Sequence, residues 1–574
     1  MDNKEIANIF NEISFFLEIK GENPFKSRTY QQASKIIEGL EAPVHTLLED
    51  LKEGKVKGIG SGLSEKIEEL IVTGKMVYYE ELKSSFPQGL IEMSNIPGLG
   101  PKKIKVIYEQ LHIDSIGELE KTCLANRIAL LDGFGKKSQD NILAGIAHIK
   151  KFTGQHLYSD AFKSASAIYV ELKSLKIIQK ISIAGSLRRK KEVVKDIDIV
   201  ASSNEPMPVM NYFVSLPEVE TVIAKGNTKS SVILHNGIQA DLRIVNQDEF
   251  PFALHHFTGS KEHNILMRSR ALKMDLKMNE YGIFRDEIRI NCSNEEEIFK
   301  VLELAYIPPE LREGMEEIEA AERNEIPHLI EEHDIKGILH VHSNYSDGLQ
   351  KIEELAHATQ KMGYSYLGIC DHSQSAAYAG GLKPEAVKRQ HEEIDRINMN
   401  FKGFKILKGI ESDILSDGSL DYPEAILQTF DFVVISIHSK LQMDEESMTR
   451  RIITAMQNPY TTILGHPTGR LLLSRDGYPI GMKKIIDSAK KNKVVIELNA
   501  HPQRLDIDWR HLKYAKEQGV WISINPDAHT IEGLKDIEYG VGIARKGWLT
   551  SENILNTLPV DALLKIFRRK KDGN

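Results

Sequence analysis

Three aspartates in the middle of the chain have the residue type and spacing of a two-metal site. Asp196 and Asp198 lie two residues apart in an apolar run that predicts a strand, so both carboxylates point to one face. Asp241 lies in a second apolar run, residues 239–245. Hard oxygen ligands suit Mg²⁺, and three carboxylates on neighbouring strands could hold two ions about 3.5–4 Å apart, an arrangement that serves phosphoryl transfer.

A glycine-serine turn with a basic run precedes these aspartates. Gly185-Ser186-Leu187-Arg188-Arg189 follows the apolar run 181–184, and its turn can present backbone N–H groups to an anion. Further along, residues 254–260 lead into a helical stretch with Asn264, Arg268 and Arg270, which suits the sugar and triphosphate of a nucleotide. A helix cap beside a buried phenylalanine explains this second segment equally well when it is taken alone.

A second group of chemistry-bearing side chains follows short apolar runs in residues 335–574. The group consists of His340, His342, Asp347, His372, Glu411, His438, His466, Asp527 and His529. A single histidine at a strand end is more often structural, but nine such residues together favour metal binding. Imidazole and carboxylate ligands suit Zn²⁺, Mn²⁺ or Fe²⁺ better than Mg²⁺. With Glu411 as a bridge, two or three ions could activate a water for attack on phosphorus, the chemistry of a multinuclear phosphoesterase.

The elements that must position these residues change in type along the chain. Residues 1 to about 150 predict helices throughout, residues 151 to about 250 alternate helices with β-branched strands, and residues from about 335 contain seven short apolar runs between amphipathic helices. The last pattern predicts a parallel sheet, closed as a barrel, with its site at the carboxyl ends of the strands.

Three Gly-x-Gly turns mark the helical N-terminal region. Each is followed by an amphipathic run, and lysines such as Lys102 and Lys136 stand beside the turns. The glycine pairs are Gly58 and Gly60, Gly98 and Gly100, and Gly133 and Gly135. One copy would be an ordinary helix connection. Three copies favour helix-hairpin-helix units that contact phosphates through backbone N–H groups without reading base sequence.

An acidic segment separates the two halves of the chain. Residues 310–334 carry ten acidic side chains against Arg312 and Arg323. We expect an exposed helix and a linker here, with the charges on a solvated face and a domain boundary within the segment.

Composition limits the classes of protein that fit. The chain has 574 residues, a formal net charge of −8 and only three cysteines, Cys123, Cys292 and Cys370, none of them in a C-x-x-C pair. This usage fits a reducing compartment and excludes a disulfide scaffold or a zinc ribbon. The N-terminus lacks the apolar segment of a signal peptide, and no apolar run approaches the ~20 residues of a membrane span. We therefore expect a cytoplasmic protein without membrane contact.

The motifs together resemble two known families. Residues 1 to about 317 are similar to the family X DNA polymerases, the family of DNA polymerase beta, and residues from about 335 resemble a PHP (polymerase and histidinol phosphatase) domain. The combination is typical of bacterial family X polymerases with 3′–5′ exonuclease activity. It implies an all-α helix-hairpin-helix N-terminal region, an α+β nucleotidyltransferase palm and a (β/α)7 TIM-like barrel.

The resemblance also implies a division into domains. The expected parts are a lyase-like helical domain (1–82), a helical DNA-binding subdomain (83–150), the palm (151–248), a subdomain for the nascent base pair (249–317), the acidic linker (318–334) and the PHP phosphoesterase domain (335–574).

By resemblance, the polymerase half contains a complete nucleotidyltransferase site. Asp196, Asp198 and Asp241 would hold two Mg²⁺ ions, with Asp241 nearest the attacking 3′-hydroxyl. The residues expected to contact the incoming nucleotide are Gly185, Ser186, Arg189, His256, Phe257, Gly259, Asn264 and Arg268; His256 replaces the family's sugar-facing tyrosine.

The N-terminal region would add lyase chemistry. Lys66 matches the lysine that forms a Schiff base with 5′-deoxyribose phosphate, and Lys26 and Tyr30 lie in a similarly placed DNA-binding segment. Gly62 stands where the family usually has a basic residue, so lyase or AP-site activity is a weaker expectation than polymerisation.

In the PHP domain the resemblance implies three metal ions, with Mn²⁺ or Zn²⁺ as the expected metals. The implied groups are His340, His342, Glu411 and Asp527; Glu411, His438 and His466; and Asp347, His372 and His529. Glu497 and Asn499 lie outside this pattern and receive no role.

The sequence therefore predicts a repair polymerase that fills short gaps in primed double-stranded DNA with dNTPs and trims 3′ ends with its PHP domain. We expect a monomer. Two alternatives remain at this point: a small-molecule phosphatase of the histidinol-phosphate type joined to a polymerase, and a DNA end-binding module with vestigial sites. The complete sets of carboxylates and PHP residues count against the second.

Overall fold

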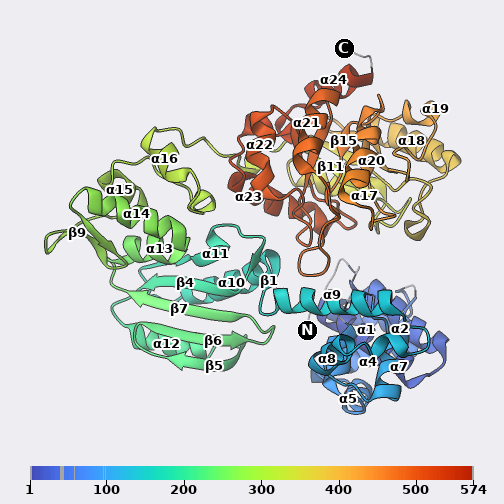
Figure 1. The fold of residues 1–574 in the computed structure, drawn as a ribbon, viewed down its shortest axis with the longest axis horizontal. Helices are drawn as coiled ribbons and strands as arrows, with labels where there is room; N and C mark the ends of the chain where they lie inside the picture. The colour runs from blue at the N-terminus through green and yellow to red at the C-terminus, as the bar shows by residue number, and fades with distance from the viewer. Residues whose placement is uncertain are drawn as a thin grey trace. The chain divides into compact units, whose positions relative to one another are not determined.

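The computed structural model describes residues 3–38, 40, 44–56, 58–94, 96 and 98–571. The chain divides into two compact units, one formed by residues up to 153 with 473–475 and the other by residues 154–472 and 476–574 (Figure 1). The predicted finer division into six parts stays a prediction. Residues 1 and 2 lie outside the described residues. They belong to the N-terminal segment that we expect to lack a signal peptide. None of the helices in the described ranges combines the length and apolarity that a membrane crossing needs.

The first unit is helical in its described residues, as predicted. Its helices are α1 (Asn3–Lys20), α2 (Pro24–Glu38), α3 (Leu48–Lys52), α4 (Ser61–Thr73), α5 (Val77–Ser84), α6 (Gln88–Ser94), α7 (Pro101–Leu111), α8 (Ile116–Leu124) and α9 (Lys136–Phe152). Two apolar cores hold them together, one around Phe10, Phe16 and Ile67 and the other around Ile104 and Ile146, all fully buried.

Each glycine pair of this unit lies at the start of a helix. Gly60, Gly100 and Gly135 are extended N-cap residues of α4, α7 and α9, and they supply no capping side chain. The preceding glycines, Gly58, Gly98 and Gly133, have φ angles of +93°, +80° and +77°, which other residues adopt only with strain. The hairpins therefore leave the first backbone N–H groups of three helices without a side-chain cap.

The palm is a five-stranded sheet in the second unit. Its order is β2-β4-β7-β6-β5, in which only β4 and β7 are parallel neighbours. The strands are β2 (Lys180–Ile183), β4 (Asp196–Ser202), β5 (Val219–Lys225), β6 (Lys229–Leu234) and β7 (Gln239–Val245), and a short pair, β1 (His156–Leu157) and β3 (Val193–Val194), lies beside it.

Successive side chains of β4 point to opposite faces of the palm sheet, so one face forms the core and the other carries the candidate site. Ile197 and Ile199 pack with α10 (Tyr158–Lys173) and α12 (Pro206–Val214) in one buried core. Asp196 and Asp198 lie on the other face, because side chains two apart share a face of a strand. Val200, on that same face, packs against α13 (Phe250–Thr258).

The next segment packs around a core that includes the fully buried Phe299. Its elements are α14 (Lys261–Lys273), the antiparallel strands β8 (Lys277–Asn279), β9 (Gly282–Arg285) and β10 (Ile288–Ile290), α15 (Glu295–Val301) and α16 (Glu317–Glu322).

The prediction that the acidic run forms a solvated face is wrong for its first part. Arg312 and Glu317 are fully buried, and Glu310 is 8% exposed. Arg312 Nη1 lies 2.6 Å from a carboxylate oxygen of Glu295, and Glu317 accepts hydrogen bonds from the His263 ring and two backbone N–H groups. Buried partners of this kind compensate the lost hydration, and they are contributed by segments that sequence spacing does not relate.

The C-terminal part is the predicted barrel. Seven parallel strands follow one another in chain order, and a bridge between Val341 and Ala528 links the first to the end of the last. The strands are β11 (Gly337–Val341), β12 (Tyr366–Ile369), β13 (Lys405–Asp413), β14 (Phe432–Ser436), β15 (Ile463–Leu464), β16 (Val495–Asn499) and β17 (Ile522–Asn525).

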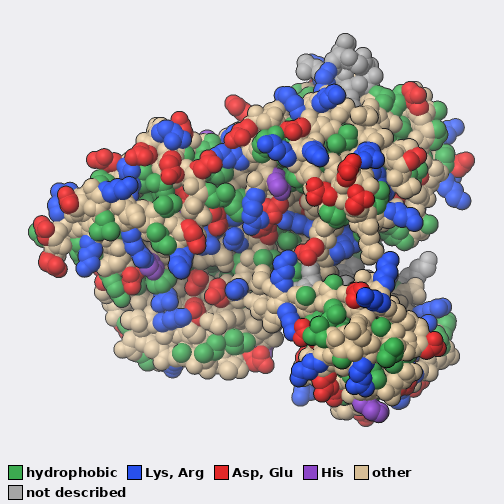
Figure 2. Space-filling model, viewed as in Figure 1, with side chains coloured by type: hydrophobic (Ala, Val, Ile, Leu, Met, Phe, Trp, Pro, Cys, Tyr) green, Lys and Arg blue, Asp and Glu red, His purple; other side chains and the backbone are tan. Residues whose placement is uncertain are grey.

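Helices surround the barrel and complete its core. They are α17 (Ile352–Lys361), α18 (Pro384–Asn398), α19 (Glu424–Leu427), α20 (Glu445–Gln457), α21 (Met482–Asn492), α22 (Leu512–Glu517), α23 (Ile537–Lys546) and α24 (Val560–Lys571). One further short helix, α11 (Gly185–Arg188), belongs to the palm and not to the barrel. Acidic and basic side chains are interspersed over the face of this unit that Figure 2 shows.

Candidate active sites

Parallel pairing brings the palm carboxylates together. Asp198 on β4 and Asp241 on β7 are direct register partners, and Asp196 lies two residues before Asp198. Gly185 begins α11 beside them with a φ of +61°, and a Cβ built there would lie 2.3 Å from Asp198 Oδ2. Only glycine lets the turn approach the carboxylate this closely.

The charges at this site call for a cation. Burial, reinforced by the neighbouring carboxylates Asp196 and Asp241, raises the pKa of Asp198 to about 7. Burial and Asp241 also raise the pKa of Asp196. For Asp241 burial opposes ionisation, but hydrogen bonds from Lys229, whose Nζ lies 2.6 Å from Asp241 Oδ2, and from Ser231 lower its pKa. The donor set fits divalent metal ions, which would lower the pKa of all three carboxyls.

Metal binding at the palm should depend on pH through Asp198. Because protonated Asp198 is a poor ligand, Mg²⁺ affinity should fall about tenfold per pH unit below pH 7 and level off above it. Titrating Mg²⁺ into the wild-type protein and into Asp198→Ala by calorimetry between pH 5.5 and 8.5 gives the binding at the palm site as the difference between the two. An affinity independent of pH across this range would contradict the assignment.

Two arginines of the α11 turn are engaged by the following segment. Arg189 donates from Nε to Glu313 (3.1 Å) and from Nη1 to the Thr258 carbonyl, while Arg188 pairs with Glu295 and donates to the Thr258 hydroxyl (2.7 Å). Arg189, expected to bind a triphosphate, is therefore ion-paired. No pattern in the sequence predicts that Glu295 and Glu313 pair with these arginines.

The structure gathers three of the other predicted nucleotide contacts, Phe257, Asn264 and Arg268, around His256. Asn264 donates to the His256 carbonyl (2.8 Å), Arg268 Nη2 lies 3.2 Å from His256 Nδ1, and Phe257 lies under the Arg243 guanidinium at 4.1 Å. Ser186 lies in α11, and Gly259 follows α13 with a φ of +70°. The roles of these residues stay predictions.

The predicted lyase residues meet at a residue that the sequence did not single out. Lys26 and Lys66 approach the same ring, that of Tyr78, at 5.3 and 5.4 Å, and Tyr30 stacks on it at 6.2 Å. The Tyr78 hydroxyl raises the pKa of Lys26 through a hydrogen bond. Tyr78 belongs to no recognisable motif, so only the folded structure shows that it contacts Lys26 and Lys66.

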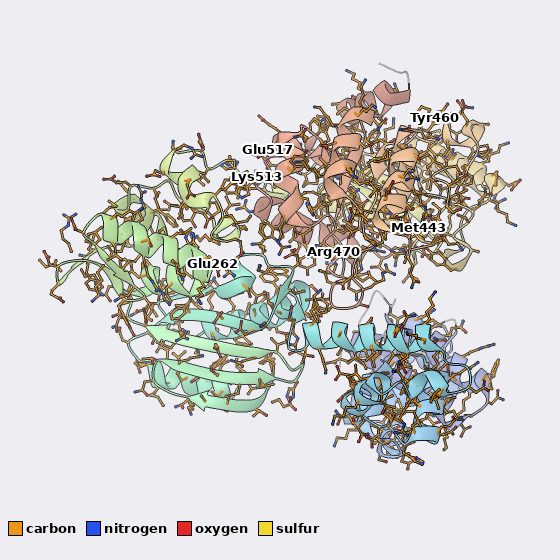
Figure 3. The ribbon with its side chains drawn as sticks, viewed as in Figure 1. Glu262, Met443, Tyr460, Arg470, Lys513 and Glu517 are labelled. Carbon is orange, nitrogen blue, oxygen red and sulfur yellow. The ribbon has the colours of Figure 1, made fainter. Side chains whose placement is uncertain are left out.

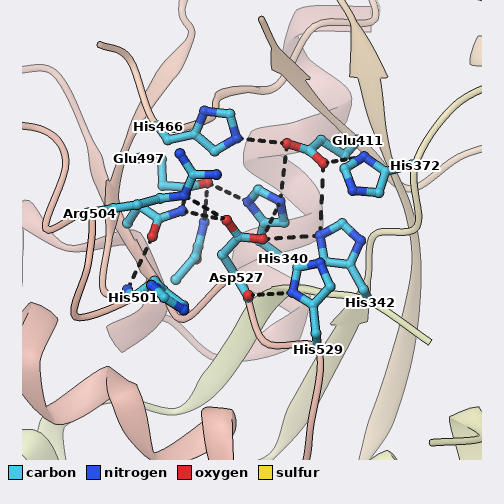
Figure 4. A network of polar contacts seen from close by, with 12 residues as sticks. His340, His342, His372, Glu411, His466, Glu497, His501, Arg504, Asp527 and His529 are labelled. Atoms are coloured by element: carbon cyan, nitrogen blue, oxygen red, sulfur yellow. Dashed lines mark hydrogen bonds and ion pairs between the residues drawn. The ribbon is translucent and has the colours of Figure 1, made fainter. Parts of the chain in front are cut away.

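One carboxylate, that of Glu411, lies at the centre of the barrel residues, and Figure 4 shows most of them around it. Glu411 is 1% exposed. Five imidazoles have a nitrogen 2.9–3.8 Å from its oxygens: His372, His466, His438, His340 and His342. A carboxylate that faces several imidazoles from both oxygens has the arrangement of a bridging ligand.

Two further carboxylates complete the cluster. Asp527 Oδ1 lies 3.1 Å from His342 Nε2 and 3.5 Å from His340 Nε2. Asp347 lies 3.4–3.7 Å from ring nitrogens of His529, His372 and His342. The backbone is strained at two of these positions, because His340 and Asp527 have φ angles of +57° and +52°.

The barrel residues fit a metal cluster. Five buried polar atoms of the cluster make no hydrogen bond of suitable geometry among the described residues: Nε2 of His340, Nδ1 of His342, His372 and His466, and Oε2 of Glu411. Of these, His372 Nδ1 and Glu411 Oε2 lie 2.9 Å apart as an ion pair. Ligand atoms within 4.8 Å of one another form three overlapping groups: His342, Asp347, His372 and His529; His340, His342 and Asp527; and His372, Glu411 and His438. These groups share His342 and His372, which the predicted groups do not share, and they contain Glu411 once instead of twice. His466 belongs to none of the three, although its Nε2 lies 2.9 Å from Glu411 Oε1.

A second layer of carboxylates holds the histidines. Asp413 Oδ1 lies 2.6 Å from His438 Nδ1, and Glu497 Oε2 lies 2.7 Å from His340 Nδ1. Glu497 also accepts from Asn499 (2.7 Å) and Asn525 (3.3 Å). A carboxylate at Nδ1 fixes the ring so that Nε2 faces a metal. Asn499 and Glu497 thus act behind the cluster, a role that the sequence pattern did not provide.

Replacing Glu497 should loosen the metal cluster. We expect Glu497→Gln to weaken Mn²⁺ binding about 10–100-fold, because the His340 ring loses its charged acceptor. Equilibrium dialysis measures this change directly, and primer extension by the palm serves as the folding control. Unchanged Mn²⁺ affinity would remove Glu497 from the site.

Metal binding at the barrel should release protons. Burial opposes the charged form of His438 and His529, yet Glu411 and Asp413 raise the pKa of His438 to about 10, and Asp347 and Asp527 raise that of His529 to about 9. Both rings are therefore protonated at pH 7.5 without metal and must lose that proton to bind one.

The Mn²⁺ affinity of the barrel should accordingly rise from pH 7 to 9. Calorimetry of the Asp198→Ala variant in two buffers of different ionisation enthalpy counts the protons released. Release of about one proton or more per ion is the expected result, and zero release would contradict the protonated cluster.

A mixed sheet with three clustered carboxylates and a parallel barrel with a histidine-rich centre define a two-site protein suited to metal-assisted phosphoryl transfer. Comparison with known proteins agrees. Residues 1–76 match the helix-hairpin-helix domain family, residues 253–313 the DNA polymerase beta thumb family and residues 339–501 the PHP domain family.

Individual relatives cover either the whole chain or parts of it. A Bacillus subtilis protein named DNA polymerase/3′–5′ exonuclease PolX is 41% identical over 573 residues, which is 98% of this chain and 100% of that protein. A probable phosphatase of Thermoanaerobacter sp. (strain X514) is 30% identical over 38% of this chain and 89% of its own length. A solved Leishmania infantum polymerase beta ternary complex is 21% identical, covers 39% of this chain and 98% of that chain, and has a TM-score of 0.27. The chain belongs to the PolX family of DNA polymerase/3′–5′ exonucleases.

Proposed function

We propose that the protein is a gap-filling DNA polymerase of DNA repair that also shortens 3′ ends with its barrel. The observation that carries this proposal is that one chain holds two separate metal-type sites, the carboxylates of β4 and β7 and the histidine cluster around Glu411. Full-length identity to a protein named for both activities supports it.

At the palm, the chain's own residues would bind and orient the reactants. The Gly185–Arg189 turn would supply backbone N–H groups for the triphosphate of a dNTP, and Arg189 would exchange its Glu313 partner for a phosphate oxygen. Asp241 would lie nearest the 3′-hydroxyl and help to take its proton. Two Mg²⁺ ions, when bound by Asp196, Asp198 and Asp241, would stabilise the charge that develops as pyrophosphate leaves. The uncapped helix N-termini of the three hairpins suit DNA phosphates on either side of a gap.

At the barrel, the cluster would hold Mn²⁺ or Zn²⁺, which supplies an activated water when bound. The protein excludes bulk water from the ligands, since Glu411, His340 and His342 are buried, and it holds their rings through Glu497 and Asp413. We further propose that the protein is a cytoplasmic monomer, and that Lys66 beside Tyr78 supplies lyase chemistry at 5′-deoxyribose phosphate.

The two activities should separate by mutation. On gapped DNA with a 5′-labelled primer, Asp198→Ala should reduce dNTP addition by at least about 10²-fold and leave 3′ shortening intact, whereas His342→Ala should do the reverse. Gel analysis with Mg²⁺ or Mn²⁺, with and without dNTPs, measures both.

The outcome also tests the main rival. If the wild-type protein extended primers but shortened none under any metal, the nuclease proposal would fall, and small phosphate monoesters would become the substrates to test. The relatives named probable phosphatases make that assay the natural second step.

A further inference from the structure

An exposed aromatic side chain stands at the barrel's metal cluster. The Tyr378 ring is 71% exposed, and its centroid lies 5.9 Å from the His372 ring and 6.3 Å from the His438 ring. Both histidines belong to the nine candidate ligands. A substrate bound at these histidines would therefore have the Tyr378 ring within reach.

The loop that carries Tyr378 is tied down on both sides of it. Ser375 donates from its backbone N–H to Asp421 Oδ2 (2.7 Å) and from its hydroxyl to Asp413 Oδ2 (3.0 Å). Gly381 N–H donates to the Ala376 carbonyl (3.1 Å), and the neighbouring Ala379 is buried. The ring is thus exposed on a fixed backbone, which lowers the entropy that a stacked ligand would cost.

A cation lies at the same cluster on a different loop, the one that follows β16. Arg504 Nε is 3.4 Å from Asp527 Oδ2, and the Arg504 side chain is 20% exposed (Figure 4). Its backbone carbonyl accepts a hydrogen bond from Arg470 Nε (2.9 Å), and Arg470, labelled in Figure 3, also pairs with Asp508 at 2.9 Å. The loop is fixed, and a planar guanidinium suits a phosphate oxygen pair.

An aromatic ring and a guanidinium beside one phosphoesterase centre match the two parts of a nucleotide. We propose that Tyr378 and Arg504 select nucleic acid at the barrel site: the Tyr378 ring stacks on the base of the 3′-terminal nucleotide, and Arg504 binds a phosphate oxygen of the same strand. The proposal rests on the proposed nuclease function and names the side chains that favour a nucleotide over a small phosphate ester. Stacking on an aromatic ring accepts any base, so no sequence preference is expected.

Two labelled oligonucleotides test the role of Tyr378. One ends in an ordinary 3′ nucleotide and the other in a tetrahydrofuran nucleotide that has no base. With the full-length protein and Mn²⁺, Tyr378→Ala should lower kcat/KM about tenfold for the ordinary end and leave the base-free end unchanged, and Tyr378→Phe should restore the ordinary end. Tyr460→Ala is the matched control, because the Tyr460 hydroxyl binds Glu424 of α19.

Replacing Arg504 should affect the ordinary and the base-free oligonucleotide equally, because its proposed partner is a phosphate oxygen. Arg504→Gln should raise KM for both oligonucleotides by about tenfold, with partial recovery in Arg504→Lys. Since Arg504 also contacts Asp527, Mn²⁺ stoichiometry and affinity are measured by calorimetry in each variant and should remain those of the wild type.

The outcomes distinguish a failure of the roles proposed for Tyr378 and Arg504 from a failure of the nuclease function itself. Equal losses of Tyr378→Ala on both ends, or no loss on either, would overturn the stacking role. Loss of Mn²⁺ in Arg504→Gln would make Arg504 a structural partner of Asp527 and overturn its phosphate role. A wild-type protein that shortens neither oligonucleotide would overturn the nuclease function itself.

Discussion

Repulsion between crowded carboxylates, and the cations needed to balance it, is the constraint on which both sites depend. Asp196, Asp198 and Asp241 share one face of the palm sheet, and burial, reinforced by their mutual repulsion, raises the pKa of Asp198 to about 7. In the barrel, Glu411 stays ionised among five imidazoles, and neighbouring carboxylates hold His438 and His529 protonated. Lys229 and these imidazolium rings balance the charge without metal, and divalent ions would replace them.

The two folds meet this constraint in different ways. The palm uses one parallel pair, β4 and β7, to place carboxylates side by side, and a glycine at 185 lets the Gly185–Arg189 turn come close to them. The barrel collects its candidate ligands from the carboxyl ends of six of its seven strands, and β16 contributes Glu497 behind them. Outer carboxylates, Asp413 and Glu497, then orient rings that strand geometry alone would leave free to rotate.

The sequence was sufficient for the seven barrel strands, for β2, β4 and β7 of the palm and for the residues that converge on them, but not for β5, β6 or β8–β10. Strand period and the position of polar residues after apolar runs predict the Asp198–Asp241 pairing and the cluster around Glu411, because both follow from local geometry. Sequence spacing could not predict Lys229, Tyr78, Asp413 or the role of Glu497. Each acts through a partner on another element, and none belongs to a motif.

The acidic run of residues 310–334 also shows that sequence does not predict tertiary partners. A dense row of carboxylates predicts a solvated surface, yet Glu317 and Arg312 are buried because His263 and Glu295 compensate them. Glu313 likewise pairs with Arg189 and Lys546, residues more than a hundred positions away. Charge pattern alone does not reveal such partners, since burial of charge depends on tertiary pairing.

Anomalous X-ray scattering from Mn²⁺-soaked crystals tests the central claim most directly. Two separate groups of manganese peaks are predicted, one between Asp196, Asp198 and Asp241 and one with two or three ions around Glu411. Peaks in the palm group should disappear in Asp198→Ala crystals and those in the barrel should remain. Absence of ions from either group in the wild-type protein at saturating Mn²⁺ would contradict the assignment of two independent metal sites.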